Sequence, residues 1–180
     1  MRRLPGDASA AREIARIIRV DHAGEYGAKR IYDGQLAVLG RRRSSAARKI
    51  RHMAEQEQRH LDAFEKLVLD RRVRPTALSP VWHVAGFALG AATALMSEKA
   101  ALACTDAVET EIDKHYAEQL RHLGSDDPEL AGDISEFQAE ELEHRDTARE
   151  AGAAQAVGYP LLTAAIRAGC RMAIELSKRI

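Results

Sequence analysis

The sequence predicts an all-α protein, in which two similar helical hairpins form a four-helix bundle with a long crossover and an additional C-terminal helix. Helix-forming residues dominate nearly every segment, and the alternation of β-branched and polar residues that marks strands is absent. Short connections separate the long helical stretches, as between antiparallel neighbours in a bundle. The two halves of the chain also resemble each other, so we expect the hairpins to be repeats.

The first hairpin is expected over about residues 8–72, and an apolar crossover over about 73–97 follows it. Glycine after the first helix and a serine N-cap before the second mark the turn between them. The expected helices run from about Ala8 to Leu39, with Gly40 behind it, and from Ser44 or Ser45 to about Arg72.

A third helical stretch opens at Ser79-Pro80, a cap followed by a first-turn proline. Its pattern continues to Leu123, which is too long for one unbroken helix, so we expect a break near Gly86, Gly90 or Ser97.

The second hairpin is expected over about 98–150. Asp126-Asp127-Pro128 repeats the order of cap and proline and opens its second helix. Gly158-Tyr159-Pro160 interrupts the pattern again, and the C-terminal helix is expected over about 160–179.

Composition limits the class of protein. The 180 residues are 46% hydrophobic and 30% charged, which suits one domain with a real core over 1–180 and argues against disorder. Cys104 and Cys170 lie far apart without a CxxC motif, which indicates reduced thiols. Residues 1–74 carry 18 Lys/Arg and 10 Asp/Glu, whereas 75–180 carry 9 and 17. The basic half could favour anionic lipid or nucleic acid, but solvated helix faces explain its charge more simply.

The repeat appears when the sequence is displaced by 84 residues, and it matches polar residues as well as apolar ones. Within 25–40 and 57–62 there are nine identities in 22 positions, far more than chance gives. The matched pairs are Glu25 and Glu109, Tyr32 and Tyr116, Gln35 and Gln119, Leu36 and Leu120, Leu39 and Leu123, Gly40 and Gly124, Glu57 and Glu141, His60 and His144, and Asp62 and Asp146.

The repeated acids and histidines predict a dinuclear metal site. A Glu and a His three residues apart share one helix face, and the chain has two such Glu-x-x-His motifs. One inward Glu from each remaining helix gives four carboxylates and two imidazoles, which balance two divalent ions and suit iron or manganese. The alternative is an exposed acidic stripe on the helix surfaces, but such a stripe does not explain the repeat. If the acids are buried and no metal is bound, we expect some of them to take up protons. The candidate ligands are Glu25, Glu57, His60, Glu109, Glu141 and His144.

Longer strings resemble the demethoxyubiquinone hydroxylase family of ubiquinone biosynthesis, a ferritin-like family, over nearly the whole chain. They are Arg19-Val20-Asp21-His22-Ala23-Gly24-Glu25-Tyr26-Gly27-Ala28, Glu57-x-x-His60-Leu61, Val108-Glu109-x-x-Ile112-x-x-His115-Tyr116-x-x-Gln119-Leu120 and Glu140-Glu141-Leu142-Glu143-His144-Arg145-Asp146.

The resemblance implies a membrane-associated monooxygenase that hydroxylates a polyprenyl quinol ring with O2 at a di-iron centre. It implies the same six ligands, with Glu109 bridging both irons, and NADH or another reductant as electron source. His115 and Tyr116 match a pair that the family places near substrate and electron entry. A lipid-presenting accessory protein is also implied.

Other residues near the expected site leave alternatives open. Asp21 and Asp106, one turn before two of the expected ligands, are candidate partners for the second nitrogens of the ligating imidazoles. Tyr32 and Tyr116 suit either core packing or a redox or substrate role. Gly24 and Gly27 flank Glu25 and suit either a channel or a close helix crossing.

The crossover suggests contact with a membrane. Residues 75–96 carry no charge and are apolar on every side, and Arg71, Arg72 and Arg74 precede them. A full span and an internal helix are both open, but docking at the membrane surface is favoured because the segment is only weakly hydrophobic. Arg2-Arg3 is not followed by an apolar export segment. We therefore expect a peripheral protein on the cytoplasmic side of a bacterial inner membrane, or on the matrix side in mitochondria.

Competing functions share part of this pattern. An iron- or peroxide-handling protein of the ferritin or rubrerythrin kind would use the same ligands but would not need an uncharged crossover. A helical scaffold does not explain the matched polar residues. A tRNA hydroxylase, or any nucleic-acid partner, is disfavoured because aromatic residues make up only 4% of the chain. A homodimer through the apolar third helix is a further expectation.

Overall fold

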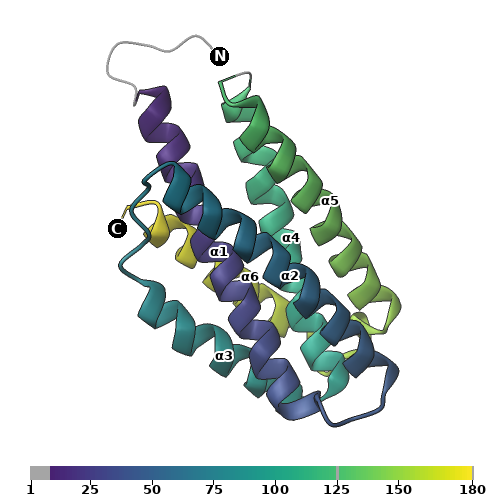
Figure 1. The fold of residues 1–180 in the computed structure, drawn as a ribbon. Helices are drawn as coiled ribbons and strands as arrows, with labels where there is room; N and C mark the ends of the chain where they lie inside the picture. Colours follow the sequence, from purple (N-terminus) through teal and green to yellow (C-terminus); the bar gives the residue numbers. More distant parts are fainter. Residues whose placement is uncertain (1–8, 125, 180) are drawn as a thin grey trace.

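The computed structural model describes residues 9–124 and 126–179, and within them it contains six α-helices, one short 3-10 helix and no strand (Figure 1). This confirms the all-α prediction. The expected helix start at Ala8 and the Arg2-Arg3 pair lie outside the described residues. The helices are α1 (Ala10–Leu39), α2 (Ser45–Asp70), α3 (Ser79–Met96), α4 (Glu98–Leu123), α5 (Pro128–Glu150) and α6 (Tyr159–Ser177), with the 3-10 helix η1 (Ala153–Gln155) before α6.

Capping side chains begin four of these helices. Ser9, Ser44 and Asp127 each accept a hydrogen bond from the backbone N–H three residues further on. The long third stretch breaks at Ser97, while Gly86 and Gly90 stay inside α3. Ser97 has an extended backbone and caps α4 by accepting from Ala100 N, so the break satisfies an otherwise free donor.

The helices form three layers. The layer of α1 and α4 lies between α2 and α5 on one side and α3 and α6 on the other (Figure 1). The first hairpin, α1 with α2, and the second, α4 with α5, make up the four-helix bundle, and α3 crosses between them.

Glycine lets α3 approach α1 closely. A Cβ atom at Gly90 would lie 1.9 Å from the carbonyl oxygen of Ile31, and one at Gly34 would lie 2.1 Å from that of Phe87. The opposite face of α3 is exposed, with Val84 66% and Leu95 74% accessible. The alternative of a purely internal helix therefore does not hold for α3.

The apolar core has two main parts, one toward each end of the bundle. One contains Leu39, Ile50, Met53 and Leu102, and the other contains Ile18, Phe64, Leu130 and Ile134. Along each bundle helix the predicted ligand positions lie between residues of these two clusters. The apolar ends therefore surround a polar centre and hold its side chains away from water.

Candidate metal centre

The structure brings all six predicted ligands together. Each bundle helix contributes, and every one of the six residues is at most 1% exposed. They form two overlapping groups whose candidate ligand atoms lie within 4.8 Å of one another. One group is Glu25, Glu57, His60 and Glu141, and the other is Glu57, Glu109, Glu141 and His144.

Glu57 and Glu141 belong to both groups, so they are the carboxylates placed to be shared by two ions. The resemblance implied that Glu109 would bridge, but Glu109 belongs to one group only. The shared acids are the two from the Glu-x-x-His motifs, and Glu141 contacts Nδ1 of both histidines.

The oxygen atoms of this cluster suit a metal pair. Glu109 Oε2 and Glu57 Oε2 are buried without a hydrogen-bond partner, and Glu57 Oε1 and Glu25 Oε2 are buried with only a histidine nitrogen nearby, at 3.2 and 3.5 Å. Buried carboxylate oxygens without a donor are costly unless a cation satisfies them. Four carboxylates and two imidazoles form a hard, mainly oxygen donor set that fits two iron or manganese ions.

Two tyrosines orient the carboxylates across the repeat. Tyr32 of the first hairpin donates to Glu109 Oε1 of the second at 2.9 Å. Tyr116 of the second donates to Glu25 Oε1 of the first. Each phenol thus holds one oxygen of a carboxylate and leaves the other oxygen free for an ion.

Both histidines turn Nδ1 toward the centre. His60 Nδ1 lies 3.1 Å from Glu141 Oε1 and 3.5 Å from Glu25 Oε2. His144 Nδ1 lies 3.1 Å from Glu141 Oε2 and 3.2 Å from Glu57 Oε1. Burial alone would lower the pKa of each imidazole, but the facing carboxylates raise the pKa of His60 to about 12 and that of His144 to about 9.

Protons would therefore offset part of the charge of the carboxylates when no metal is bound. Burial raises the pKa of Glu57 to about 8 and raises the pKa values of Glu25 and Glu109 as well. Burial acts the same way on Glu141, but hydrogen bonds from His144 and His60 outweigh it and lower the pKa of Glu141 to about 2. The expectation that some buried acids take up protons without metal agrees with these directions.

The second nitrogens of the histidines face residues that the sequence did not single out. His60 Nε2 lies 2.8 Å from Glu140 Oε2, and His144 Nε2 lies 3.1 Å from Gln56 Oε1. Positions 56 and 140 are related by the same displacement as the ligands, but their residues differ, so a search for identities passes over them.

The expectation that Asp21 and Asp106 support the imidazoles was therefore wrong. Asp106 accepts from Arg149 at 2.7 Å and from Tyr159 instead. Asp21 accepts from Gln119 at 2.6 Å. The outer nitrogens of the two histidines thus contact Glu140 and Gln56, and the two aspartates bind other side chains.

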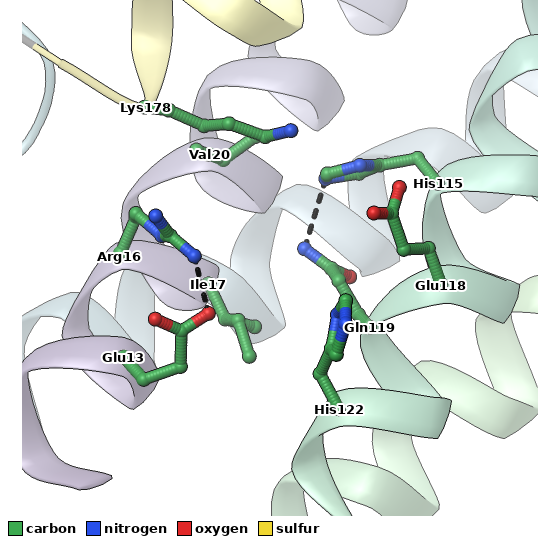
Figure 2. A pocket seen from close by; sticks show the side chains of 9 residues that line it. All are labelled: Glu13, Arg16, Ile17, Val20, His115, Glu118, Gln119, His122 and Lys178. Atoms are coloured by element: carbon green, nitrogen blue, oxygen red, sulfur yellow. Dashed lines mark hydrogen bonds and ion pairs between the residues drawn. The ribbon is translucent and has the colours of Figure 1, made fainter. Parts of the chain in front are cut away.

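His115 lies outside the metal cluster, at a pocket between α1, α4 and the end of α6 (Figure 2). Figure 2 shows His115 and Gln119 pointing toward each other from α4, with Lys178 extending over the opening. Gln119 Nε2 lies 2.9 Å from His115 Nε2, which is 3.4 Å from the buried Asp21. A polar chain thus leads from the pocket into the bundle, and Tyr116 lies beside it.

The remaining candidates lie elsewhere. The other four histidines, His22, His52, His83 and His122, belong to neither metal group. A Cβ atom at Gly24 or Gly27 would meet nothing within 4 Å, so both positions have room for a larger side chain.

Fold and site together define a helical-bundle protein with a buried carboxylate–histidine cluster suited to two metal ions. Residues 12–177 match the family described as ubiquinone biosynthesis protein COQ7, and the chain belongs to this family. The resemblance read from the sequence strings is thereby confirmed.

Relatives in distant organisms resemble nearly the whole chain. A Rhodospirillum rubrum protein named 3-demethoxyubiquinol 3-hydroxylase is 57% identical over 99% of this chain and 84% of its own. A Mus musculus protein named NADPH-dependent 3-demethoxyubiquinone 3-hydroxylase, mitochondrial, is 54% identical over 92% of this chain and 77% of its own. The Saccharomyces cerevisiae 5-demethoxyubiquinone hydroxylase, mitochondrial, is 44% identical over 97% and 81%.

Proposed function

We propose that this chain hydroxylates the ring of a demethoxyubiquinol in ubiquinone biosynthesis, at a di-iron centre held by the six predicted ligands. The observation that carries the proposal is the pair of overlapping Glu and His groups in the core of the bundle. The names of its relatives supply the substrate class.

The chain would hold one ion with Glu25 and His60, the other with Glu109 and His144, and both with Glu57 and Glu141. A bound pair of ferrous ions supplies electrons for the reduction of O2 and a site at which this occurs. The protein fixes the positions of the ligands and keeps water away through its apolar ends.

Hydroxylation with O2 also needs protons. Replacing a ring hydrogen with a hydroxyl group while the second oxygen atom leaves as water consumes two electrons and two protons. We assign the electrons to a reduced nicotinamide, since several relatives are named NADPH-dependent, whereas the family resemblance implied NADH or another reductant. Comparing NADH with NADPH as the electron source in one turnover assay tests this choice.

We propose that protons enter along the row of polar side chains that starts at the pocket in Figure 2. His115, near the surface end, would pass the proton directly to the buried Asp21, whose Oδ1 lies 3.4 Å from His115 Nε2, while the amide of Gln119 contacts both side chains and orients them. Burial raises the pKa of Asp21, although contact with His115 works against it. Asp21 Oδ2 has no hydrogen-bond partner and is thus free to accept a proton. The Tyr116 hydroxyl donates to Glu25, so it would give its proton to that carboxylate and regain one from the side of His115, whose ring lies beside its own.

The long apolar tail of a polyprenyl quinol favours work at a membrane surface. By length and composition α3 is able to span a membrane, but one face of α3 is packed on α1, so we propose that α3 lies along the surface instead. Arg72 and Arg74 are exposed beside it, whereas Arg71 pairs with Asp127 and Glu129.

The side of the membrane and the partners are likewise proposals. Mitochondrial relatives suit the matrix side, and the bacterial equivalent is the cytoplasmic side of the inner membrane. A homodimer, expected through the third helix, or a lipid-presenting accessory protein, implied by the family resemblance, would use the same apolar face.

Product analysis tests the function. The reduced, iron-loaded protein is mixed with a demethoxyubiquinol and ¹⁸O₂, and the ring is examined for one labelled oxygen atom by mass spectrometry. Glu57→Gln should abolish the labelled product, and Glu65→Gln, an exposed change on the same helix, should not. Iron oxidation or peroxide loss without a hydroxylated ring would instead indicate the iron- or peroxide-handling alternative.

A further inference from the structure

The two metal groups have matching ligands but unlike surroundings. Each contains the two shared acids, one further glutamate and one histidine. The repeat also supplies one tyrosine for each of the unshared glutamates. A pair of ions would therefore be held equally if only the ligands mattered.

The symmetry ends at the outer nitrogen of each histidine. His60 Nε2 meets a carboxylate oxygen of Glu140 at 2.8 Å, whereas His144 Nε2 meets the amide oxygen of Gln56 at 3.1 Å. With Nδ1 directed at the metal position, Nε2 carries the proton and donates in both cases. An imidazole that donates to a carboxylate is a stronger electron donor at its other nitrogen than one that donates to a neutral amide.

Neighbouring side chains reinforce the difference. Arg59 Nη2 binds both oxygens of Glu140, at 2.8 and 2.9 Å, and fixes the carboxylate against His60. Phe137 covers the ring of His60, with ring centroids 4.3 Å apart. His144, by contrast, lines an open pocket between α2 and α5 together with Met53 and Gln56.

We propose that the two metal positions are unequal, with the ion at His60 bound first and released last, and the ion at His144 exchanging more readily. Glu140 and Gln56 set the order as positioning residues that act through the histidines. The inference rests on the proposed dinuclear site and adds a division of labour within it. A carboxylate partner and a covered ring hold one ion, and a neutral partner beside an open pocket leaves the other accessible.

Site-resolved metal binding tests the order. Metal-free protein is crystallised with one equivalent of Mn²⁺, and anomalous diffraction shows which position fills first. The wild type should fill the His60 position, and the exchanged double variant Gln56→Glu with Glu140→Gln should fill the His144 position. Calorimetry with Mn²⁺ should show the tighter step weakened roughly 10–100-fold by Glu140→Gln alone.

The controls separate this effect from charge and folding. Glu136→Gln makes the same charge change at an exposed position on α5 and should leave both binding steps unmoved. Gln56→Glu alone should tighten the weaker step, a gain that misfolding does not produce. Equal occupancy at one equivalent in the wild type, or an unchanged order in the double variant, overturns the proposal. Failure of the wild type to bind two Mn²⁺ ions would overturn the metal centre itself, which is a different result.

Discussion

When no metal is bound, protons would offset part of the charge of the buried cluster, which makes the stability of the protein depend on pH. The folded state holds protons on Glu57 up to a pKa of about 8 and on His144 up to about 9, above the values near 4.5 and 6.5 that these groups have when unfolded. Raising the pH therefore removes protons that only the folded state retains. Each such proton costs about 1.4 kcal/mol of unfolding free energy per pH unit.

We thus expect the metal-free protein to lose stability between pH 6.5 and 8. Glu141 contributes no slope there, since its lowered pKa of about 2 keeps it ionised throughout. Metal ions replace the protons, so the unfolding free energy of the Mn²⁺-loaded protein should stay constant or increase over the same pH range. Chemical unfolding of both forms at several pH values measures the slopes, and equal slopes would contradict the proton balance.

The paired tyrosines allow a second prediction at the scale of single residues. Tyr32 and Tyr116 make equivalent hydrogen bonds to Glu109 and Glu25, but only Tyr116 lies beside His115, with ring centroids 6.4 Å apart. If Tyr116 serves proton or electron entry, Tyr116→Phe should lower kcat roughly 10–100-fold more than Tyr32→Phe. Metal content should remain two ions per chain in both variants. Equal losses of kcat in the two variants would mean that both tyrosines only position the carboxylates they bind.

Identical residues made the carboxylate–histidine cluster predictable, and the residues that contact its histidines from outside were missed because they differ between the repeats. Glu57 and His60 recur as Glu141 and His144, so the repeat alone indicated the cluster. Gln56 and Glu140 occupy equivalent positions without being identical, and their role depends on which imidazole nitrogen faces outward. Only the folded bundle determines that orientation.

At the scale of the helices, the crossing of α1 and α3 depends on glycine. Gly90→Ala would place a Cβ atom 1.9 Å from the backbone of Ile31, where no flexible side chain is able to move aside. We expect a loss of about 1–3 kcal/mol in unfolding free energy. Gly132→Ala on α5 is the matched control, because its Cβ would meet nothing within 4 Å and alanine favours the helix by about 0.5–1 kcal/mol.

Chemical denaturation of the two variants measures this difference. The changes in unfolding free energy should have opposite signs. Gly90→Ala should lower it by pushing α3 away from α1, and Gly132→Ala should raise it by favouring the helical backbone of α5. A neutral Gly90→Ala would mean that α3 is not held against α1 at this distance.

Capping residues and prolines in the sequence predicted where helices begin and end, but they did not predict how the helices pack against one another. Proline at the start of α3 and the caps Ser44 and Asp127 marked real boundaries. Three candidate breaks remained between residues 79 and 123, because glycine both interrupts helices and permits close packing. In the structure Gly90 has the second role and Ser97 ends the helix.

At the scale of the whole molecule, the layers separate two kinds of surface. The histidine ligands come from α2 and α5, and their outer nitrogens face polar residues there. Most of the exposed large apolar residues lie on α3 and α6, on the other side of α1 and α4, including Val84, Leu95, Leu161 and Met172. Helical periodicity indicated an apolar third helix, but it did not predict that α3 and α6 lie on the same side of the molecule. Only the tertiary packing determines that arrangement.

This apolar side predicts how the protein meets a substrate with a long tail. Val84→Glu with Leu95→Glu places two charges on the exposed face of α3, away from the six predicted ligands. Binding to vesicles containing anionic phospholipid should weaken at least about tenfold, because burying each charge at the interface opposes docking. The KM for a long-tailed demethoxyubiquinol should rise, and kcat for a water-soluble short-tailed analogue should stay unchanged. Leu69→Glu is the control, since Leu69 is 76% exposed on α2 and should not affect vesicle binding. If the α3 variant bound vesicles like the wild type, the membrane would have to meet another face, and the quinol would need a different route to the metal centre.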